Sequence, residues 1–204
     1  MENFTEKEKQ LLRNLNTPEK IQDFINKIPI NFEEDGKDSF MSPIMVLRKN
    51  KCHCIEGALF AAFLFWFNGI GKPLVVDLRG TKEDCDHVIA VFRKEGKWGA
   101  ISKTNHPVLR YREPIYESIR ELVMSCFHEY SDSKGNKTLR EYSFPVDLSV
   151  FGREWIFSEE NLWHIYDHLD KVKHFKILTR EQEKNLRKQD KIEIFLDKVV
   201  EWKK

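Results

Sequence analysis

The most apolar part of the chain lies between residues 50 and 68. Its apolar positions recur with the spacing of a helix face, and the opposite side of the same segment is apolar as well. A helix that is apolar nearly all round is buried inside a protein. The longest uninterrupted apolar run, residues 58–67, is about half of the ~20 residues that a membrane-spanning helix needs. The pattern therefore predicts a central buried helix and no membrane span.

Short segments with strand character follow this helix. They cover residues 73–78, 86–92 and 97–102, and turn residues separate them. Runs of this length, rich in β-branched and aromatic residues, are typical of strands. Residues 94–96, Lys-Glu-Gly, separate the last two segments and predict a tight hairpin. These segments indicate an antiparallel sheet.

Helical periodicity predicts further helices on both sides of this sheet. They are expected at residues 6–15, 17–28, 42–47 and 115–130, and from residue 158 onward. A long final helix is expected after the capping box that Thr179 forms with Gln182. We find no repeat and no long linker. The sequence predicts one α+β domain over 1–204. It has N-terminal helices over 1–41, a core over 42–130 with the central helix on an antiparallel sheet, and a mainly helical extension over 131–204.

The charge balance bears on partners and location. The chain carries 34 Lys and Arg against 33 Asp and Glu, for a net charge of +1. A near-neutral chain has no global field that would hold nucleic acid, so no nucleic-acid partner is expected, and the basic stretch after Lys171 is interpreted as a solvated helix. The first residues are too charged for a signal peptide, and four cysteines make no secreted disulfide framework. We expect a cytoplasmic protein, and the sequence makes no prediction of its oligomeric state.

Cysteine chemistry is suggested by the order of three features. Cys54 opens the buried helix, His87 opens the strand at 86–92, and polar residues 102–105 end the partner strand. A helix N-terminus lowers the pKa of a thiol, and a nearby histidine exchanges the proton of the nucleophile. Free N–H groups at the same helix start bind an oxyanion. The order predicts a thiol nucleophile with a histidine base.

These features resemble the transglutaminase-like branch of the papain-like cysteine protease superfamily, and most closely its uncharacterised bacterial members. The resemblance covers residues 42–110. It rests on CIEGA at 54–58, NGI at 68–70, PLVVDL at 73–78, DHVIAVF at 86–92 and KWGAIS at 97–102. It implies a papain-like core. It also implies an enzyme that acts on amide or related acyl bonds through a thioester, as protease, amidase or acyl transferase.

The resemblance also implies roles for single residues. Cys54 matches the nucleophile and His87 the base, while the position of the family's Asp falls on Ser102. A serine accepts a hydrogen bond from an imidazole but brings no charge. Asn105 is the second candidate for orienting His87, if the strand ends with a bend. The expected partner is a peptide or another amide-containing substrate, and no cofactor is expected.

Other interpretations stay open. Cys52 is a rival nucleophile. Glu56 is either a helix-start carboxylate favoured by the helix dipole or a substrate contact. A zinc site would draw on Cys52, His53, Cys54, Cys85 and His87, and a redox pair would join Cys54 to Cys52 or Cys85. An inactive scaffold would bind a peptide in a groove covered or extended by Trp155, Trp163 and Tyr166. His164 and His168 lack an HExxH pattern and are expected at a surface or an interface.

Overall fold

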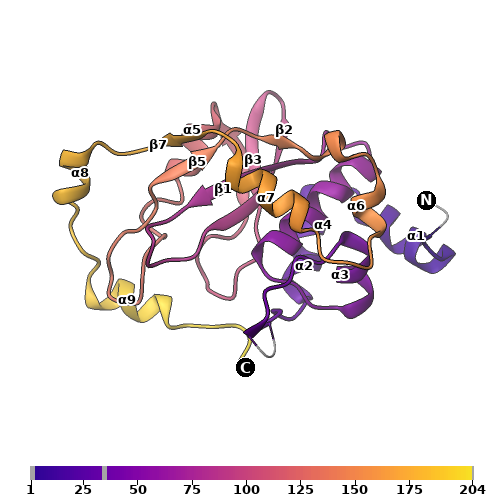
Figure 1. The fold of residues 1–204 in the computed structure, drawn as a ribbon, viewed down its shortest axis with the longest axis horizontal. Helices are drawn as coiled ribbons and strands as arrows, with labels where there is room; N and C mark the ends of the chain where they lie inside the picture. Colours follow the sequence, from indigo (N-terminus) through magenta and orange to yellow (C-terminus); the bar gives the residue numbers. More distant parts are fainter. Residues whose placement is uncertain (1–2, 34–35, 204) are drawn as a thin grey trace.

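The computed structural model describes residues 3–33 and 36–203, and its central feature is an antiparallel sheet (Figure 1). Seven strands form this sheet within the described residues, in the order β4-β3-β2-β1-β5-β7, and β6 pairs with β1. The strands are β1 Leu74–Arg79, β2 His87–Lys94, β3 Lys97–Ile101, β4 Arg112–Tyr116, β5 Glu141–Ser143, β6 Val146–Asp147 and β7 His174–Lys176. The three strands predicted from the sequence are confirmed as β1, β2 and β3.

The hairpin between β2 and β3 closes as its turn residues predict. Glu95 and Gly96 both have positive φ angles, 51° and 80°, so two residues in the left-handed region connect the strands. Turns of this kind match the right-handed twist of a hairpin. The turn sets the register that pairs Lys94 with Lys97 and Ala90 with Ile101. This register places the first residue of β2 close to the last residue of β3, at the end of the hairpin opposite its turn.

Helices cover the sheet on both faces. They are α1 Glu6–Asn14, α2 Pro18–Lys27, α3 Pro43–Lys49, α4 Cys54–Phe67, α5 Ile119–Met124, α6 Glu154–Phe157, α7 Trp163–Lys171, α8 Arg180–Lys184 and α9 Lys191–Asp197, with a 3₁₀ turn at Leu148–Phe151. Threonine or serine side chains cap α1, α2 and α3, and Pro18 and Pro43 stand in the first turns of α2 and α3. Figure 1 shows α1 at one end of the molecule and α8 and α9 at the other.

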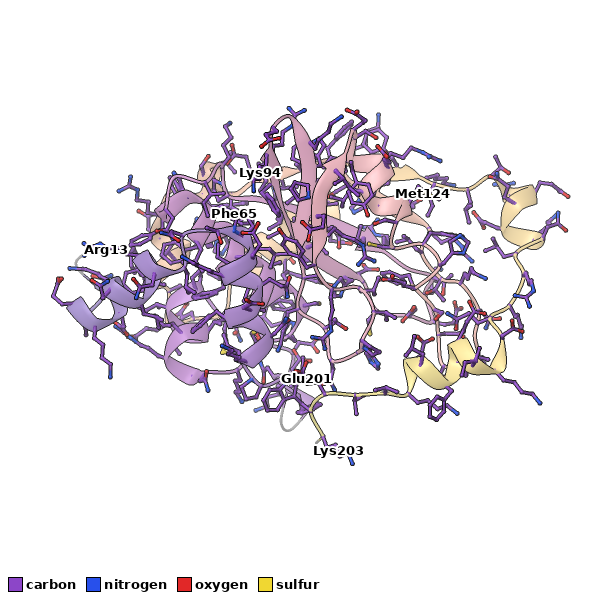
Figure 2. All side chains as sticks on the ribbon, turned by 180° about the vertical axis from the view of Figure 1, so that it is seen from behind. Arg13, Phe65, Lys94, Met124, Glu201 and Lys203 are labelled. Carbon is purple, nitrogen blue, oxygen red and sulfur yellow. The ribbon has the colours of Figure 1, made fainter. Side chains whose placement is uncertain are left out.

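The central helix α4 packs on β1 and β2. Strand residues of alternating position separate two cores: Val75, Val88, Ala90 and Ile101 face α4, whereas Val76, Leu78, Ile89 and Val91 face α5. Helix α4 is apolar on all sides because α1, α2 and α3 cover the faces that the sheet leaves free. Figure 2 shows the back of the molecule, with Phe65 of α4 among the helices and Met124 of α5 on the other side of the strands. This packing fixes where the first residue of α4 lies.

The helix predicted over 115–130 is wrong in extent. Ile115 belongs to β4, and the helix there covers only Ile119–Met124. The competing signal is Pro114, which lacks an N–H group and is tolerated in β4 because this strand lies at the edge of the sheet. The periodicity that favoured a helix arises instead from an edge strand, a short helix and the turns that follow it.

The long final helix is also wrong, because two short helices, α8 and α9, replace it. The backbone between them bonds to the loop at 131–137: the N–H of Gln189 donates to Gly135 O at 2.9 Å, and Lys137 Nζ donates to Arg187 O at 2.7 Å. In a continuous helix, the N–H of Gln189 and the C=O of Arg187 would bond within the helix instead of to the loop. The sequence predicts a mainly helical extension here. The described residues 131–203 carry the short helices α6, α7, α8 and α9, but they also supply β5, β6 and β7, which the sequence did not predict.

Residues 201–203 lie toward the end of the molecule that holds the N-terminal helices (Figure 2). Figure 2 shows Glu201 and Lys203 on an extended segment that leaves α9 in that direction. Glu201 N–H donates to Asn105 O at 2.9 Å, and Trp202 bonds to the Asn105 side chain. Among the described residues, no helix combines the length and apolarity needed to cross a membrane.

Candidate active site

Cys54 is the first residue of α4 and is partly exposed. Its helix has 14 residues, and the first N–H groups of a helix have no partner within the helix. The thiol therefore lies where the helix dipole favours a negative charge. Burial of the rest of α4 holds this position, since the helix cannot rotate without disrupting its packing against the sheet and against α1, α2 and α3.

His87 and Ser102 meet beside this thiol. His87 is the first residue of β2, and its Nε2 lies 2.6 Å from Ser102 Oγ. Ser102 directly follows β3 and is buried. The structure thus brings together three of the predicted site residues, Cys54, His87 and Ser102. Ser102 occupies the place beside the imidazole that the resemblance assigns to it.

Ser102 is held by Gln22, a residue that the sequence analysis missed. The N–H of Ser102 donates to Gln22 Oε1 at 3.0 Å, and Gln22 Nε2 donates to Ser102 O at 2.8 Å. Gln22 comes from α2 and is itself buried. The available signal was a polar side chain one helical turn from the apolar residues Pro18 and Ile25. This pair of bonds fixes the backbone that presents the Ser102 hydroxyl to His87.

The pKa of the Cys54 thiol lies below its ordinary value. Burial opposes the thiolate, but hydrogen bonds from His53 and His87 outweigh it and lower the pKa of Cys54 from 9.0 to about 5. Burial instead raises the pKa of Cys52 to about 12 and also raises the pKa of Cys85 and of Cys126. Cys54 is therefore the thiol that is ionised at neutral pH, and Cys52, fully buried, does not fit the role of a rival nucleophile.

His53 is the second imidazole at the site. It is the N-cap residue of α4, and its Nε2 lies 2.6 Å from Ser39 O. The same nitrogen lies 3.3 Å from Glu33 Oε1 and 3.6 Å from Glu56 Oε1. Burial disfavours a charged ring, but bonding to Cys54 and the nearby carboxylate of Glu56 prevail and raise the pKa of His53 to about 9. The sequence analysis counted His53 only as a zinc ligand.

Glu56 is fully buried and ties the loop before α3 to the start of α4. Its Oε1 accepts hydrogen bonds from Ser39 Oγ at 2.8 Å and from the N–H of Met41 at 3.0 Å, and its Oε2 accepts one from the N–H of His53 at 3.0 Å. Asn31 Nδ2 donates to both oxygens. A carboxylate with this many donors and no exposed surface is a helix-start residue rather than a substrate contact.

Two cavities meet at Cys54. One has a volume of about 510 Å³ and is also lined by His87, Thr104 and His106. The other has a volume of about 400 Å³ and is also lined by Phe40, His53 and Tyr166. Cys85 and Asp86 line both, so the loop before β2 separates them. The Cys54 side chain therefore lines a cavity on each side of this loop.

Asn105 lies apart from His87 in its bonding. Its Nδ2 donates to Trp202 O at 2.9 Å, and its Oδ1 accepts from the N–H of Trp202 at 2.8 Å. Both ends of the amide are used to hold the C-terminal segment. The candidate role of Asn105 in orienting His87 is therefore not supported by the structure, because the chain after Ser102 leads its side chain to a different partner.

The remaining candidates separate as follows. All four cysteines are free. Within residues 3–33 and 36–203, no group of three His, Cys, Asp or Glu side chains converges as a metal site would require. Trp155 is part of the core, whereas Trp163 and Tyr166 pack on Phe40 with ring centroids 4.5 and 4.6 Å away. His164 and His168 lie on the exposed side of α7.

No protein-family model matches this sequence, and no curated protein is significantly similar to it.

Proposed function

We propose that the protein is a cysteine-dependent enzyme that acts on an amide or related acyl bond through a thioester on Cys54. The observation that carries the proposal is the place of Cys54 at the N-terminus of α4, in a cavity that His87 also lines. There His87 lowers the pKa of the thiol, and Ser102 Oγ lies 2.6 Å from His87 Nε2. A helix on an antiparallel sheet, with the thiol at the helix start and the imidazole on the sheet, is the arrangement expected of a papain-like, transglutaminase-like core. The other three cysteines, which all lie among the described residues, have raised rather than lowered pKa values.

In the acylation step, the Cys54 thiolate attacks the carbonyl carbon, and the free N–H of Cys54 helps to bind the oxyanion. The C–N bond breaks as the tetrahedral intermediate collapses, and the protonated His87 gives its proton to the leaving amine. The products are a free amine, an acyl thioester on Cys54 and a neutral His87. In deacylation, His87 takes a proton from water or from an acceptor amine, which attacks the thioester and releases the thiolate.

Ser102 limits what His87 can do. Its hydroxyl accepts a hydrogen bond from His87 Nε2–H and so fixes the orientation of the ring, but it supplies no negative charge to stabilise the imidazolium. This favours a second candidate, in which the same groove binds a peptide and the thiol does not turn over. The two candidates differ in whether Cys54 forms an acyl adduct.

An acyl-trapping experiment tests the proposal. The protein is mixed with p-nitrophenyl acetate, and intact mass and peptide mapping locate the acetyl group. The proposal expects a transient acetyl group on Cys54 that hydroxylamine removes, none in Cys54→Ala, and normal labelling in the matched variant Cys85→Ala. Turnover is then measured on peptide and amide libraries. A Cys54 that is ionised but never acylated would favour the peptide-binding scaffold, and acylation at another cysteine would contradict the proposal.

A further inference from the structure

His53 takes no part in the mechanism above, although its ring is one of the two imidazoles that lower the pKa of Cys54. It precedes the nucleophile directly and lines the 400 Å³ cavity together with it. Two histidines on one sulfur raise the question of how their tasks are divided.

The proton on His53 Nε2 is fixed by its partner. Nε2 lies 2.6 Å from Ser39 O, and a carbonyl oxygen only accepts hydrogen bonds. Nε2 must therefore carry hydrogen. The other ring nitrogen, Nδ1, is at the start of α4, where the N–H of Glu56 faces the His53 side chain in a capping box. In a neutral ring Nδ1 is a lone pair that can only accept, whereas in a cationic ring it is an N–H donor for the Cys54 sulfur.

The surroundings of His53 favour the cation. Glu33 Oε1 and Glu56 Oε1 lie 3.3 and 3.6 Å from Nε2, on the side of the ring that Ser39 occupies. Glu56 is held in place by donors from the loop and from the helix start, so its charge cannot move away. Two carboxylates behind Nε2 and a thiolate ahead of Nδ1 both stabilise a doubly protonated ring.

His87 has a different environment. Its Nε2 faces the hydroxyl of Ser102, a neutral group that both donates and accepts hydrogen bonds. A ring with a neutral partner can gain and lose a proton without leaving a buried charge unpaired. His87 is therefore suited to proton transfer, whereas His53 is suited to keep its proton.

We infer that His53 is a positioning residue that stays protonated through the cycle and holds the Cys54 thiolate through Nδ1–H, while His87 alone moves protons. The positive charge of His53, itself stabilised by Glu33 and Glu56, then stabilises the Cys54 thiolate independently of His87. The inference rests on the proposed function only in taking the Cys54 thiolate to be a nucleophile, because the ionisation of Cys54 can be titrated without any substrate.

Other ionisable groups share this cavity and act on the same equilibrium. They are Asp38, Asp77, Cys85, Asp86, Tyr166 and Asp170. None is a cation, so none can replace His53 in holding the thiolate. The acids oppose the thiolate, which makes a second cation beside the sulfur more important.

The test is a pH titration of the thiolate absorbance of Cys54 in the far ultraviolet, in a background of Cys85→Ser. For the unaltered site we expect a midpoint at about pH 5. In His53→Gln, whose amide keeps a donor for Ser39 O, we expect the midpoint to rise by about two pH units, because two imidazoles share the lowering. At about pH 6 the thiolate fraction then falls about tenfold. His164→Gln, on the exposed side of α7, is the matched control and should leave the midpoint unchanged.

A second variant covers the case in which His53→Gln does not fold. Glu33→Gln keeps an oxygen for the N–H of Ser39, which donates to Glu33 Oε1 at 2.8 Å, and removes one carboxylate from His53. The midpoint should move in the same direction by a smaller amount. Loss of the whole shift in His87→Gln alone, or an unchanged midpoint in folded His53→Gln or folded Glu33→Gln, overturns the inference.

The inference and the proposed function fail in different ways. A starting midpoint near 9.0 removes the basis of both. A low midpoint that does not depend on His53 removes only the inference. A midpoint that depends on His53, in a protein that never forms an acyl adduct, keeps the inference and removes the enzyme.

Discussion

Replacing Glu56 with glutamine removes one charge and one hydrogen-bond acceptor at the start of α4. If the new NH₂ group takes the place of Oε2, it faces the N–H of His53, which now donates to Oε2 from 3.0 Å. If it takes the place of Oε1, it faces the N–H of Met41 at 3.0 Å and Ser39 Oγ at 2.8 Å. In either orientation a buried backbone donor loses its acceptor and meets another donor.

The expected cost follows from these contacts. A buried donor left without a partner costs about 1–3 kcal/mol, and the loss of charge from the remaining bonds adds about 1 kcal/mol. We therefore expect Glu56→Gln to lower the free energy of unfolding by about 2–4 kcal/mol. The measurement is urea unfolding at neutral pH, followed by circular dichroism.

Helix α9 offers a matched control. Glu193 holds the same third position in its helix, and its Oε2 accepts a hydrogen bond from the N–H of Asp190 at 2.6 Å, but the pair is exposed. Glutamine also completes a capping box, so Glu193→Gln should change the free energy of unfolding by less than about 0.5 kcal/mol. If Glu56→Gln lowers the free energy of unfolding by no more than Glu193→Gln does, the buried hydrogen bonds of Glu56 do not stabilise the start of α4 as described.

Two further predictions concern packing and pH. A Cβ at Gly57 would lie 2.6 Å from Lys103 Cβ. Gly57→Ala should therefore destabilise the fold by about 1–2 kcal/mol in urea unfolding, and it should slow acylation of Cys54 by displacing the segment that holds Ser102. Gly71→Ala, with open space around it, should change neither the urea unfolding nor the acyl trapping. His174 bonds to Asp77 at 2.9 Å, which raises the pKa of His174 above 6.5 in the folded state. The stability that this pair contributes is therefore complete below the pKa of His174 in the unfolded state, and it is lost as the pH rises through the pKa of His174 in the folded state. His174→Gln should lower the free energy of unfolding more at about pH 5.5 than at about pH 9. An equal loss at both pH values would contradict the pairing.

The strands near the site were predictable because their patterns are local. β1, β2 and β3 are short apolar runs bounded by turn residues, and Glu95-Gly96 specifies a hairpin by its own conformational preference. Once that hairpin is placed, the start of β2 and the end of β3 must lie together. In this register Ser102 is a diagonal neighbour of His87, two positions from the residue directly across, so the two polar residues could be expected near each other.

The elements that the sequence did not predict correctly depend on contacts with distant segments. The region after Thr179 has a sound helix start, yet hydrogen bonds from Gln189 to Gly135 and from Lys137 to Arg187 interrupt the helix. Helical periodicity carries no information about such contacts. The strands β5, β6 and β7 are two or three residues long, which is too short to show any alternation.

The site was predictable in part for the same reason. Cys54 and His87 stand at element ends that sequence patterns locate, whereas the role of His53 depends on Ser39 and Glu33, which reach it only when the loop before α3 folds back over the helix start. Gln22 is likewise visible only once α2 is packed beside the end of β3. The signal for His53 was its place beside the nucleophile, and the sequence analysis considered it only as a metal ligand.

The pH dependence of iodoacetamide alkylation at each cysteine, followed by mass spectrometry, tests most directly whether Cys54 is a thiolate nucleophile. Cys85 is exposed, has a raised pKa, and serves as an internal control. A low-pKa thiolate is less nucleophilic than an ordinary one, and with that allowance Cys54 should still react about tenfold faster than Cys85 at about pH 6. The account predicts a half-maximal rate at Cys54 at a pH of about 5. A half-maximal rate near 9.0, the ordinary value for a cysteine, or equal rates at Cys54 and Cys85, would contradict it.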